Sequence, residues 1–135
     1  MAAGYSGTPL AKKLGIKTGD AVALLGAPAG FATTLDGLPD DVQLRTSARG
    51  RNAVIVSFHT QRADLERRVD ALLAALEING GLWIAWPKKA SKVPTDVTED
   101  TVREVFLPLG LVDNKVCAID ETWSGLRVVW RKENR

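Results

Sequence analysis

Apolar runs separated by polar stretches predict the strands of a sheet. Residues 21–26 (AVALLG) and 82–86 (LWIAW) carry no charge, and residues 53–58 (AVIVSF) are predominantly apolar and β-branched. Such continuous apolar runs are typical of central strands that are buried on both faces. Residues 42–46 (VQLRT) alternate between apolar and polar side chains, which predicts a half-exposed edge strand.

A helical repeat predicts the longest helix over residues 63–78. Its apolar side chains recur with the spacing of one buried helix face. These side chains are Leu65, Val69, Leu72, Leu73 and Leu76. Charged residues occupy the other side, and Asn79, Gly80 and Gly81 are expected to end the helix.

Capping signals predict two shorter helices. Thr8 is expected to cap a short helix near the N-terminus, where a threonine hydroxyl can accept from a free backbone N–H. A second helix is expected over residues 98–107, begun by a capping box of Asp96 and Glu99. Pro108 stops this helix, because proline cannot continue the hydrogen-bond ladder.

The end of the chain predicts an antiparallel hairpin. Its strands are residues 115–120 and 126–131, around a turn that contains Ser124 and Gly125. Taken together, the segments give strand–helix–strand units in series, which imply parallel strands joined by right-handed crossovers. The expected fold class is α/β, with a mostly parallel Rossmann-like sheet of about six strands, helices on both faces and a C-terminal antiparallel hairpin. One domain over residues 1–135 is expected.

Composition and charge narrow the class of protein. Of 135 residues, 45% are hydrophobic and 25% are charged, and the net charge is only +2. A single cysteine, Cys117, and a single histidine, His59, make neither a structural zinc site nor an internal disulfide, so no metal is expected. Because no segment has the apolar length of a signal peptide or a membrane span, a cytoplasmic location without membrane contact is expected.

Two parts of the chain are similar to the class I methyltransferase fold. LGIKTGDAVALLGAPAGF resembles its opening helix, strand and glycine loop. AVIVSFHT, LLAALEINGGLWIAW, TVREVFLPLGL and the final hairpin resemble its second half. The middle of the chain is too short to hold every strand–helix unit of that fold. The resemblance therefore implies a trimmed, methyltransferase-like version.

More narrowly, the chain resembles a small bacterial family, domain-of-unknown-function family 3052. The segments that carry this likeness are YSGTPLAKKLGIK, PKKASKVPTDVTED and GLVDNKVCAIDETWSGLR. This resemblance implies a fold and brings no activity with it.

The loop that would hold S-adenosylmethionine departs from the methyltransferase pattern. That cofactor needs a glycine-rich loop, so that the backbone can approach it closely. Here Ala27 and Pro28 crowd the loop between Gly26 and Gly30, and Pro28 lacks a backbone donor. The acidic residue that normally holds the ribose is also missing from VQLRTS. S-adenosylmethionine is therefore a disfavoured cofactor.

Position in the fold indicates where a ligand would bind. Ligands of open α/β sheets lie beyond the carboxyl ends of the strands, where residues 26–34, 59–62 and 87–96 are expected to meet. Three lysines in the last loop favour an anionic small molecule. The residues expected to bind it are Gly26, Gly30, His59, Lys88, Lys89, Lys92 and Trp123.

Each candidate also has an explanation that involves no ligand. His59 is a candidate general base, or a histidine hydrogen-bonded to a loop carbonyl. Lys88 and Lys89 are candidates for catalysis, or members of a solvated basic loop. Trp123 covers either a ligand or the edge of the core. Cys117 is expected to be a small buried hydrophobe instead of a reactive thiol.

Three functions stay open. The preferred one is a non-catalytic binding module, because no nucleophile is visibly paired with His59 and the cofactor loop is altered. The second is an enzyme acting on an anionic small molecule, such as a degenerate methyltransferase or a similar transferase, through His59, Lys88 and Lys89. The third is a protein-interaction or dimerisation domain that uses the edge strand or the hairpin, where Val129 lies on the second face. Nucleic acid is an unexpected partner, since aromatic residues are not interleaved with the basic clusters.

Overall fold

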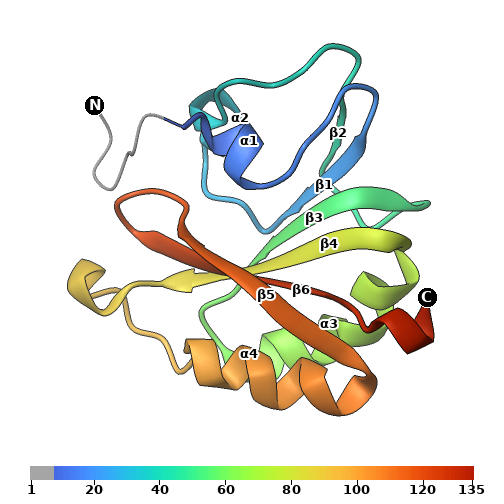
Figure 1. Cartoon of the computed structure of the whole chain (residues 1–135). Helices are drawn as coiled ribbons and strands as arrows, with labels where there is room; N and C mark the ends of the chain where they lie inside the picture. Colours follow the sequence, from blue (N-terminus) through green and yellow to red (C-terminus); the bar gives the residue numbers. More distant parts are fainter. Residues whose placement is uncertain (1–7) are drawn as a thin grey trace.

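The computed structural model describes residues 8–135, which form a six-stranded sheet in the order β2-β1-β3-β4-β6-β5 (Figure 1). The strands are β1 (Ala21–Leu25), β2 (Gln43–Arg45), β3 (Asn52–Phe58), β4 (Leu76–Pro87), β5 (Leu111–Ala118) and β6 (Trp123–Trp130). Strands β2, β1, β3 and β4 run parallel, whereas β6 is antiparallel to both β4 and β5. The predicted fold class is confirmed: the sheet is mostly parallel and ends in an antiparallel hairpin.

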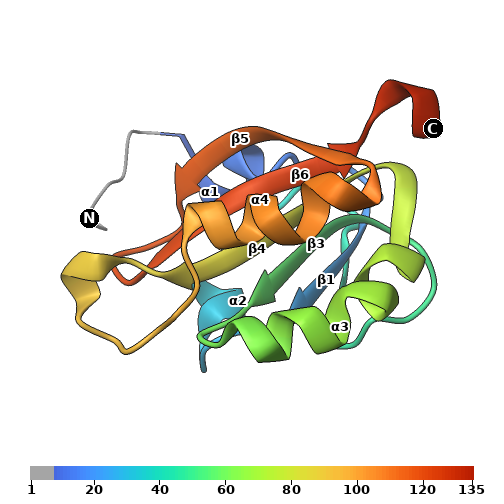
Figure 2. The same ribbon diagram turned by 90° about the horizontal axis from the view of Figure 1, so that it is seen from below.

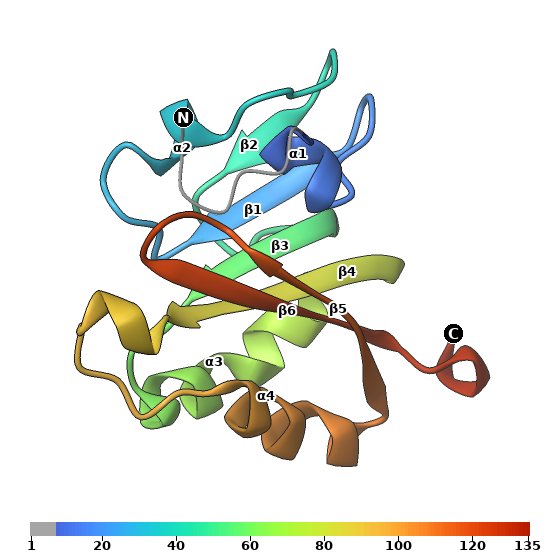
Figure 3. The same cartoon turned by 60° about the vertical axis from the view of Figure 1, so that its left-hand side comes forward.

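Helices cover both faces of this sheet. α3 (Arg62–Ala74) and α4 (Glu99–Phe106) lie side by side on one face (Figure 2). α1 (Leu10–Lys13) and the short α2 (Phe31–Thr34) belong to the opposite side (Figure 3). The 3-10 turns are η1 (Lys89–Ser91), η2 (Leu107–Leu109) and η3 (Lys132–Asn134). No helix within residues 8–135 is long and apolar enough to cross a bilayer.

Alternate residues of the central strands supply two hydrophobic cores, because successive side chains of a strand point to opposite faces. The core beneath α3 and α4 contains Ile55, Leu82 and Ile84. The core beneath α1 contains Val56 and Trp83. Burial on both faces is the physical reason for the continuous apolar runs of these strands.

The helix predicted over residues 63–78 is wrong at its C-terminal end. α3 ends at Ala74, and β4 begins at Leu76, which pairs with Asn52 of β3. Leu76 is fully buried in the same core as Leu72. At this spacing a leucine reaches the core whether its backbone is helical or extended. The apolar repeat therefore does not distinguish the end of the helix from the start of the strand.

The predicted cap of α1 is also wrong. The Thr8 side chain does not cap the helix. Instead, Asp36 accepts the Leu10 N–H on its side-chain Oδ1 at 3.0 Å and the Ala11 N–H on its backbone carbonyl at 3.1 Å. A residue from a distant loop therefore satisfies the free donors of this helix.

The capping box of α4 is not formed by the predicted pair, Asp96 and Glu99. Thr98 is the N-cap residue, and its partner in the box is Thr101. Asp96 accepts the backbone N–H of Arg62 instead, at 2.6 Å, and Glu99 pairs with Arg103. The acidic residues at this position thus serve tertiary contacts and the first helical turn.

The hairpin turn lies before the predicted one. Asp120 forms it by accepting the backbone N–H groups of Thr122 and Trp123, each at 2.8 Å. Gly125 lies inside β6, between Ala85 and Cys117 of the neighbouring strands. Gly125 allows close packing there, since a Cβ would lie 2.8 Å from the terminal methyl group of Ile119 and 3.2 Å from the ring of the buried Trp83. A glycine for close packing was mistaken for a turn glycine.

Trp83→Phe is expected to lower the free energy of unfolding by about 1–3 kcal/mol. Trp83 is fully buried, and its indole Nε1 donates to the Leu14 carbonyl at 3.0 Å, so the variant leaves that acceptor unpaired and opens a cavity. Urea unfolding measures the loss. Ile78→Ala, in the same strand but 44% exposed, is the control and should change stability far less. Equal losses in the two variants would contradict the assignment.

Candidate functional site

The loops after β3 and β4 are joined by hydrogen bonds at the carboxyl edge of the sheet. The Thr60 carbonyl accepts from the Thr95 hydroxyl at 2.7 Å and from the Asp96 N–H at 3.2 Å. The Asp96 carboxylate in turn accepts the Arg62 N–H at the start of α3. Two of the three predicted loops therefore form one connected surface.

The loop after β1 reaches the same edge. Gly26 lies so close to β3 that a Cβ on it would be 3.2 Å from the Phe58 carbonyl oxygen. Gly26 and Gly30 have φ angles of 66° and 80°, a left-handed conformation that favours glycine. A hollow of about 360 Å³, which we call the β1 hollow, lies beside this loop and is lined mainly by residues 24–33 and by Thr46.

The remaining loops enclose two further hollows. The larger, of about 540 Å³, lies beside the basic loop, residues 87–96, which carries three lysines, and we call it the basic-loop cavity. Its walls include Trp86, Lys89, Lys92, Val97 and Thr98. A third, of about 330 Å³, lies between residues 60–63 and 94–96. The β1 hollow shares no lining residue with these two. The three loops lie at the predicted edge, but the β1 hollow is separate from the other two, which adjoin each other at Pro94 and Thr95.

His59 is buried and lies in a chain of polar side chains. Its Nδ1 lies 2.8 Å from Asp64 Oδ2, and its Nε2 lies 2.7 Å from Ser57 Oγ. Because an ionised carboxylate can only accept, Nδ1 carries the proton, and Nε2 accepts from the Ser57 hydroxyl. The prediction that a loop carbonyl binds the His59 ring is therefore wrong. The expectation that no nucleophile pairs with His59 is wrong as well.

The chain Ser57–His59–Asp64 has the order of contacts of a serine hydrolase triad. However, Ser57 is 1% exposed and His59 is 2% exposed, so a substrate cannot reach the hydroxyl. Asp64 lies in the first turn of α3, and Ser57 lies in β3. The triad therefore ties the helix start to the central strand.

The environment of the triad changes two pKa values. Burial lowers the pKa of His59 below its usual 6.5, against the opposing effect of Asp64, and the Arg68 charge lowers it further. Burial raises the pKa of Asp64, but the hydrogen bond from His59 and the charges of Arg68 and Arg67 outweigh it, so the pKa falls below 3.8. A neutral histidine beside a carboxylate is the stable state at neutral pH.

One signal in the sequence pointed to Ser57. It is the polar residue within the run AVIVSF, two positions before His59. Residues two apart in an extended strand point to the same face, so the two side chains were placed to meet. The triad could therefore have been found by continuing the strand pattern through His59.

The lysines of the basic loop have different roles. Lys88 is half-buried, and its Nζ donates to the Asp120 carbonyl at 2.7 Å, which ties the loop to the hairpin turn. Lys89 and Lys92 are exposed and line the basic-loop cavity. Within residues 8–135, neither of them forms an ion pair. Lys92 has a φ of 61°, which is unusual for a residue with a side chain.

The start of α4 does not add to an anion site. Its first turn carries Glu99 and Asp100, whose negative charges oppose an anion. Thr98 and Thr101 already satisfy each other in the capping box. Positive charge for an anion in this cavity must therefore come from the lysines.

Trp123 packs against the edge of the core. Its ring meets Phe58 edge-on with 5.1 Å between centroids, and Phe58 meets Phe31 in the same way at 5.0 Å. This aromatic row belongs to the core beneath α1. Of the two roles considered for Trp123, these contacts favour the structural one. Cys117 is half-buried, and burial raises the pKa of its thiol, which keeps it neutral.

Two other expectations concern metals and association. Among the side chains that the structure describes, no three of His, Cys, Asp and Glu come together as metal ligands. Val129 is 6% exposed, so its side chain is already covered within the chain. It therefore offers no apolar surface for a partner.

Several solved structures with similar folds are methyltransferases. The chain superposes on a ribosomal protein L11 methylase from Lactobacillus delbrueckii subsp. bulgaricus with a TM-score of 0.58 and 13% identity, covering 90% of this chain and 75% of that one. A SAM-dependent methyltransferase from Aquifex aeolicus gives a TM-score of 0.57 and 15% identity, covering 87% and 85%. Magnesium protoporphyrin IX methyltransferase from Synechocystis, solved with bound SAM, gives 0.60 and 11%, covering 84% and 71%.

At these identities the likeness shows the fold alone, and the fold is methyltransferase-like. No protein-family model matches the chain, and no curated protein matches it. The resemblance to domain-of-unknown-function family 3052 therefore stays a prediction.

His59 should make the stability of the protein depend on pH. Because its folded pKa lies below 6.5, the unfolded chain binds the extra proton first as the pH falls. Its contribution is complete above 6.5 and is lost as the pH falls through the folded pKa. Urea unfolding at about pH 7.5 and about pH 5.5 should show this loss in the wild type and a smaller one in His59→Gln.

The same variant should cost about 1–3 kcal/mol at neutral pH, because Ser57 and Asp64 lose their partner. Ser57→Ala keeps His59 and is the matched control, which should retain the pH-dependent loss. Asp64 does not interfere, since it titrates below 3.8. An unchanged pH dependence in His59→Gln would overturn this assignment.

Lys88→Ala should lower the free energy of unfolding by about 1 kcal/mol, because the bond from Nζ to the Asp120 carbonyl is lost. Lys89→Ala removes the same charge from an exposed position and should stay within about 0.5 kcal/mol of wild type. Thermal unfolding measures both variants. A larger loss from Lys89→Ala would contradict the division of roles.

Proposed function

We propose that the protein is a non-catalytic binding module that holds a small anionic molecule in the basic-loop cavity. One observation carries this proposal: Lys89 and Lys92 line a cavity of about 540 Å³ and have no ion-pair partner within residues 8–135. This volume lies within the range of small-molecule sites. Two ammonium groups without counter-ions favour a carboxylate or phosphate ligand.

The walls of the cavity suggest the rest of the ligand. Trp86, Val93 and Val97 supply apolar surface. The Thr95 hydroxyl is already used, since it donates to Thr60 and accepts from the Val97 N–H. The ligand that fits best is therefore a small acid with an apolar body, held at its charged end by the lysines.

The conformation of Lys92 supports a binding role for the loop. A left-handed φ of 61° costs a residue with a Cβ on the order of 1 kcal/mol. Lys92 ends the 3-10 turn η1, and its N–H donates to the Lys89 carbonyl at 3.1 Å. The turn thereby brings both lysines to one cavity.

Binding without catalysis is supported by the burial of the one triad-like group. Ser57 and His59 are buried, and neither lines the basic-loop cavity. An enzyme acting on the same anion is the alternative. It would have to use Lys89 or Lys92 alone, without a paired base in the part of the chain described.

The residues that line the β1 hollow do not favour S-adenosylmethionine as a ligand. No carboxylate lines it within the described residues, whereas the ribose hydroxyls of such a ligand need an acceptor. Thr46, which follows Arg45 at the end of β2, stands where an acid would be expected. Pro28 removes one backbone donor from the loop.

A thermal-shift series tests the proposal with inorganic phosphate, a sugar phosphate, a short aliphatic acid and S-adenosylmethionine. A ligand at about a hundred times its Kd adds about 2.7 kcal/mol of stability and raises Tm by several degrees. We expect an apolar acid or a phosphate ester to do so, and S-adenosylmethionine to have no effect.

Lysine variants test whether the rise in Tm comes from binding in the basic-loop cavity. For the short aliphatic acid, Lys89→Ala with Lys92→Ala should abolish the rise in Tm, whereas Lys17→Ala with Lys132→Ala, two exposed lysines outside the cavity, should leave it intact. A rise with this acid that survives the first pair would overturn the proposal. A rise with S-adenosylmethionine would overturn the assignment of the β1 hollow, and turnover of a bound acid would establish the enzyme alternative.

A further inference from the structure

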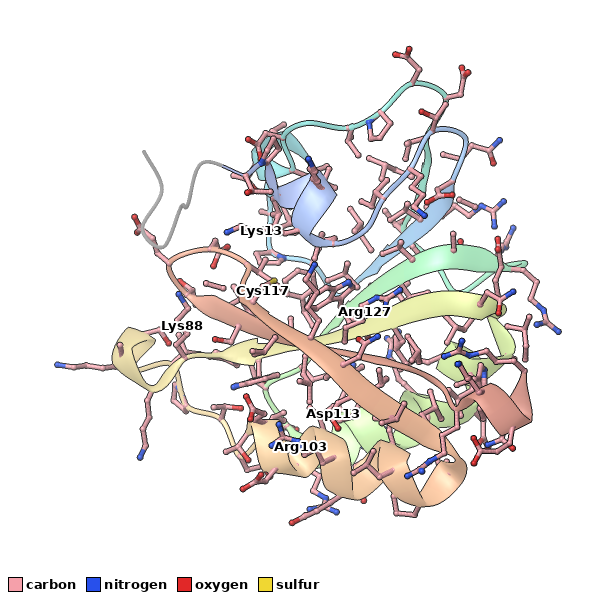
Figure 4. The ribbon with its side chains drawn as sticks, viewed as in Figure 1. Lys13, Lys88, Arg103, Asp113, Cys117 and Arg127 are labelled. Carbon is pink, nitrogen blue, oxygen red and sulfur yellow. The ribbon has the colours of Figure 1, made fainter. Side chains whose placement is uncertain are left out.

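The ion pairs between arginine and carboxylate side chains gather on one face of the sheet. The arginine–carboxylate pairs found within residues 8–135 all involve Arg62, Arg67 or Arg103, which belong to α3 and α4. Figure 4 shows one of these pairs, Arg103 and Asp113, beside α4. The opposite, α1 side of the hairpin carries cations without such partners.

Three of these cations line one hollow between α1 and β5. Lys12 and Lys13 form the last turn of α1, and Lys115 extends from β5. Together with Thr8 and residues 116–118, they enclose about 510 Å³, which we call the α1–β5 hollow. Lys13 and Cys117 lie on the same side of the hairpin in Figure 4. None of the three lysines forms an ion pair within the described residues.

Arg127 adds a fourth cation next to this group. It lies directly opposite Lys115 in the β5–β6 ladder, and like charges at that position repel. Arg127 is half-buried and lies so close over Gly81 that a Cβ there would clash with the guanidinium. Burial and the Arg135 charge lower its pKa. The side chain is held in place although no carboxylate balances it within residues 8–135.

The counter-ion is not the cysteine in the hollow. The charges of Lys13 and Lys115 lower the pKa of the Cys117 thiol, but burial raises it by more. Cys117 therefore stays neutral at physiological pH, and the positive charge of the hollow is left for a ligand.

We propose that the α1–β5 hollow is a second anion site, which binds the phosphate groups of a small phosphorylated molecule. Lysine ammonium groups from two elements can converge on one phosphate, each giving a charge-assisted hydrogen bond. Residues 116–118 of β5 complete the wall of the hollow beside the lysines. The α1–β5 hollow shares no lining residue with the basic-loop cavity, so the two sites can be tested separately.

Calorimetric titration with inorganic pyrophosphate tests the site, using the full chain with Lys89→Ala and Lys92→Ala so that the basic-loop cavity does not contribute. Adding Lys13→Ala or Lys115→Ala should each weaken binding about tenfold, as expected for a lost charge-assisted hydrogen bond. Adding Lys17→Ala, an exposed lysine outside the hollow, should change Kd less than twofold if the effect is local and not a screened long-range one. Thermal unfolding checks that each variant is folded.

Chemical-shift mapping gives the second measurement. Pyrophosphate should move the backbone amide signals of Thr8 and of residues 10–13 and 115–118, and leave the α3 and α4 signals unchanged. Equal weakening by Lys17→Ala, or shifts confined to another face, would overturn the proposal. A single-stranded oligonucleotide that binds a hundredfold more tightly than pyrophosphate, with the same sensitivity to Lys13 and Lys115, would overturn the small-molecule assignment and make this a nucleic-acid surface.

Discussion

The architecture depends on one constraint: the parallel strands at the centre of the sheet must be covered on both faces. Both faces of β1, β3 and β4 are apolar, so α1 covers one side of the sheet and α3 and α4 cover the other. Trp83 illustrates the requirement, because its ring fills one core while its indole N–H holds the end of α1 through the Leu14 carbonyl. The same parallel arrangement brings the carboxyl ends of β1, β3 and β4 to one edge, where the candidate site lies.

The fold class was predictable because burial on both faces leaves a direct trace in the residues. A strand that contributes to two cores is apolar at successive positions, as residues 82–86 are. Element ends were less predictable. Leu76 enters the same core whether it belongs to a helix or a strand, so its apolar character did not separate the two. Gly125 allows close packing against the Ile119 and Trp83 side chains, and nothing in the local sequence distinguishes that from a turn.

The place of the site follows from topology, whereas the roles of its side chains depend on contacts over long distances in the sequence. The edge formed by the three loops could be predicted once the strands were ordered. Lys88 could not be separated from Lys89, because its partner is the Asp120 carbonyl, 32 positions later. The contacts of His59 were predictable in part. Ser57 is two residues away on the same strand face, whereas the contact with Asp64 depends on how α3 begins.

The support of α1 makes this helix depend on distant parts of the fold. The helix is four residues long, far below the length at which an isolated helix is stable in water. Its first donors need Asp36, and the Leu14 carbonyl at its end needs Trp83, both of which follow it in the chain. In the folded protein α1 is therefore supported by segments that follow it in the chain. Because the α1–β5 hollow also needs β5, an anion that binds there would stabilise only the chain in which all of these segments are folded together.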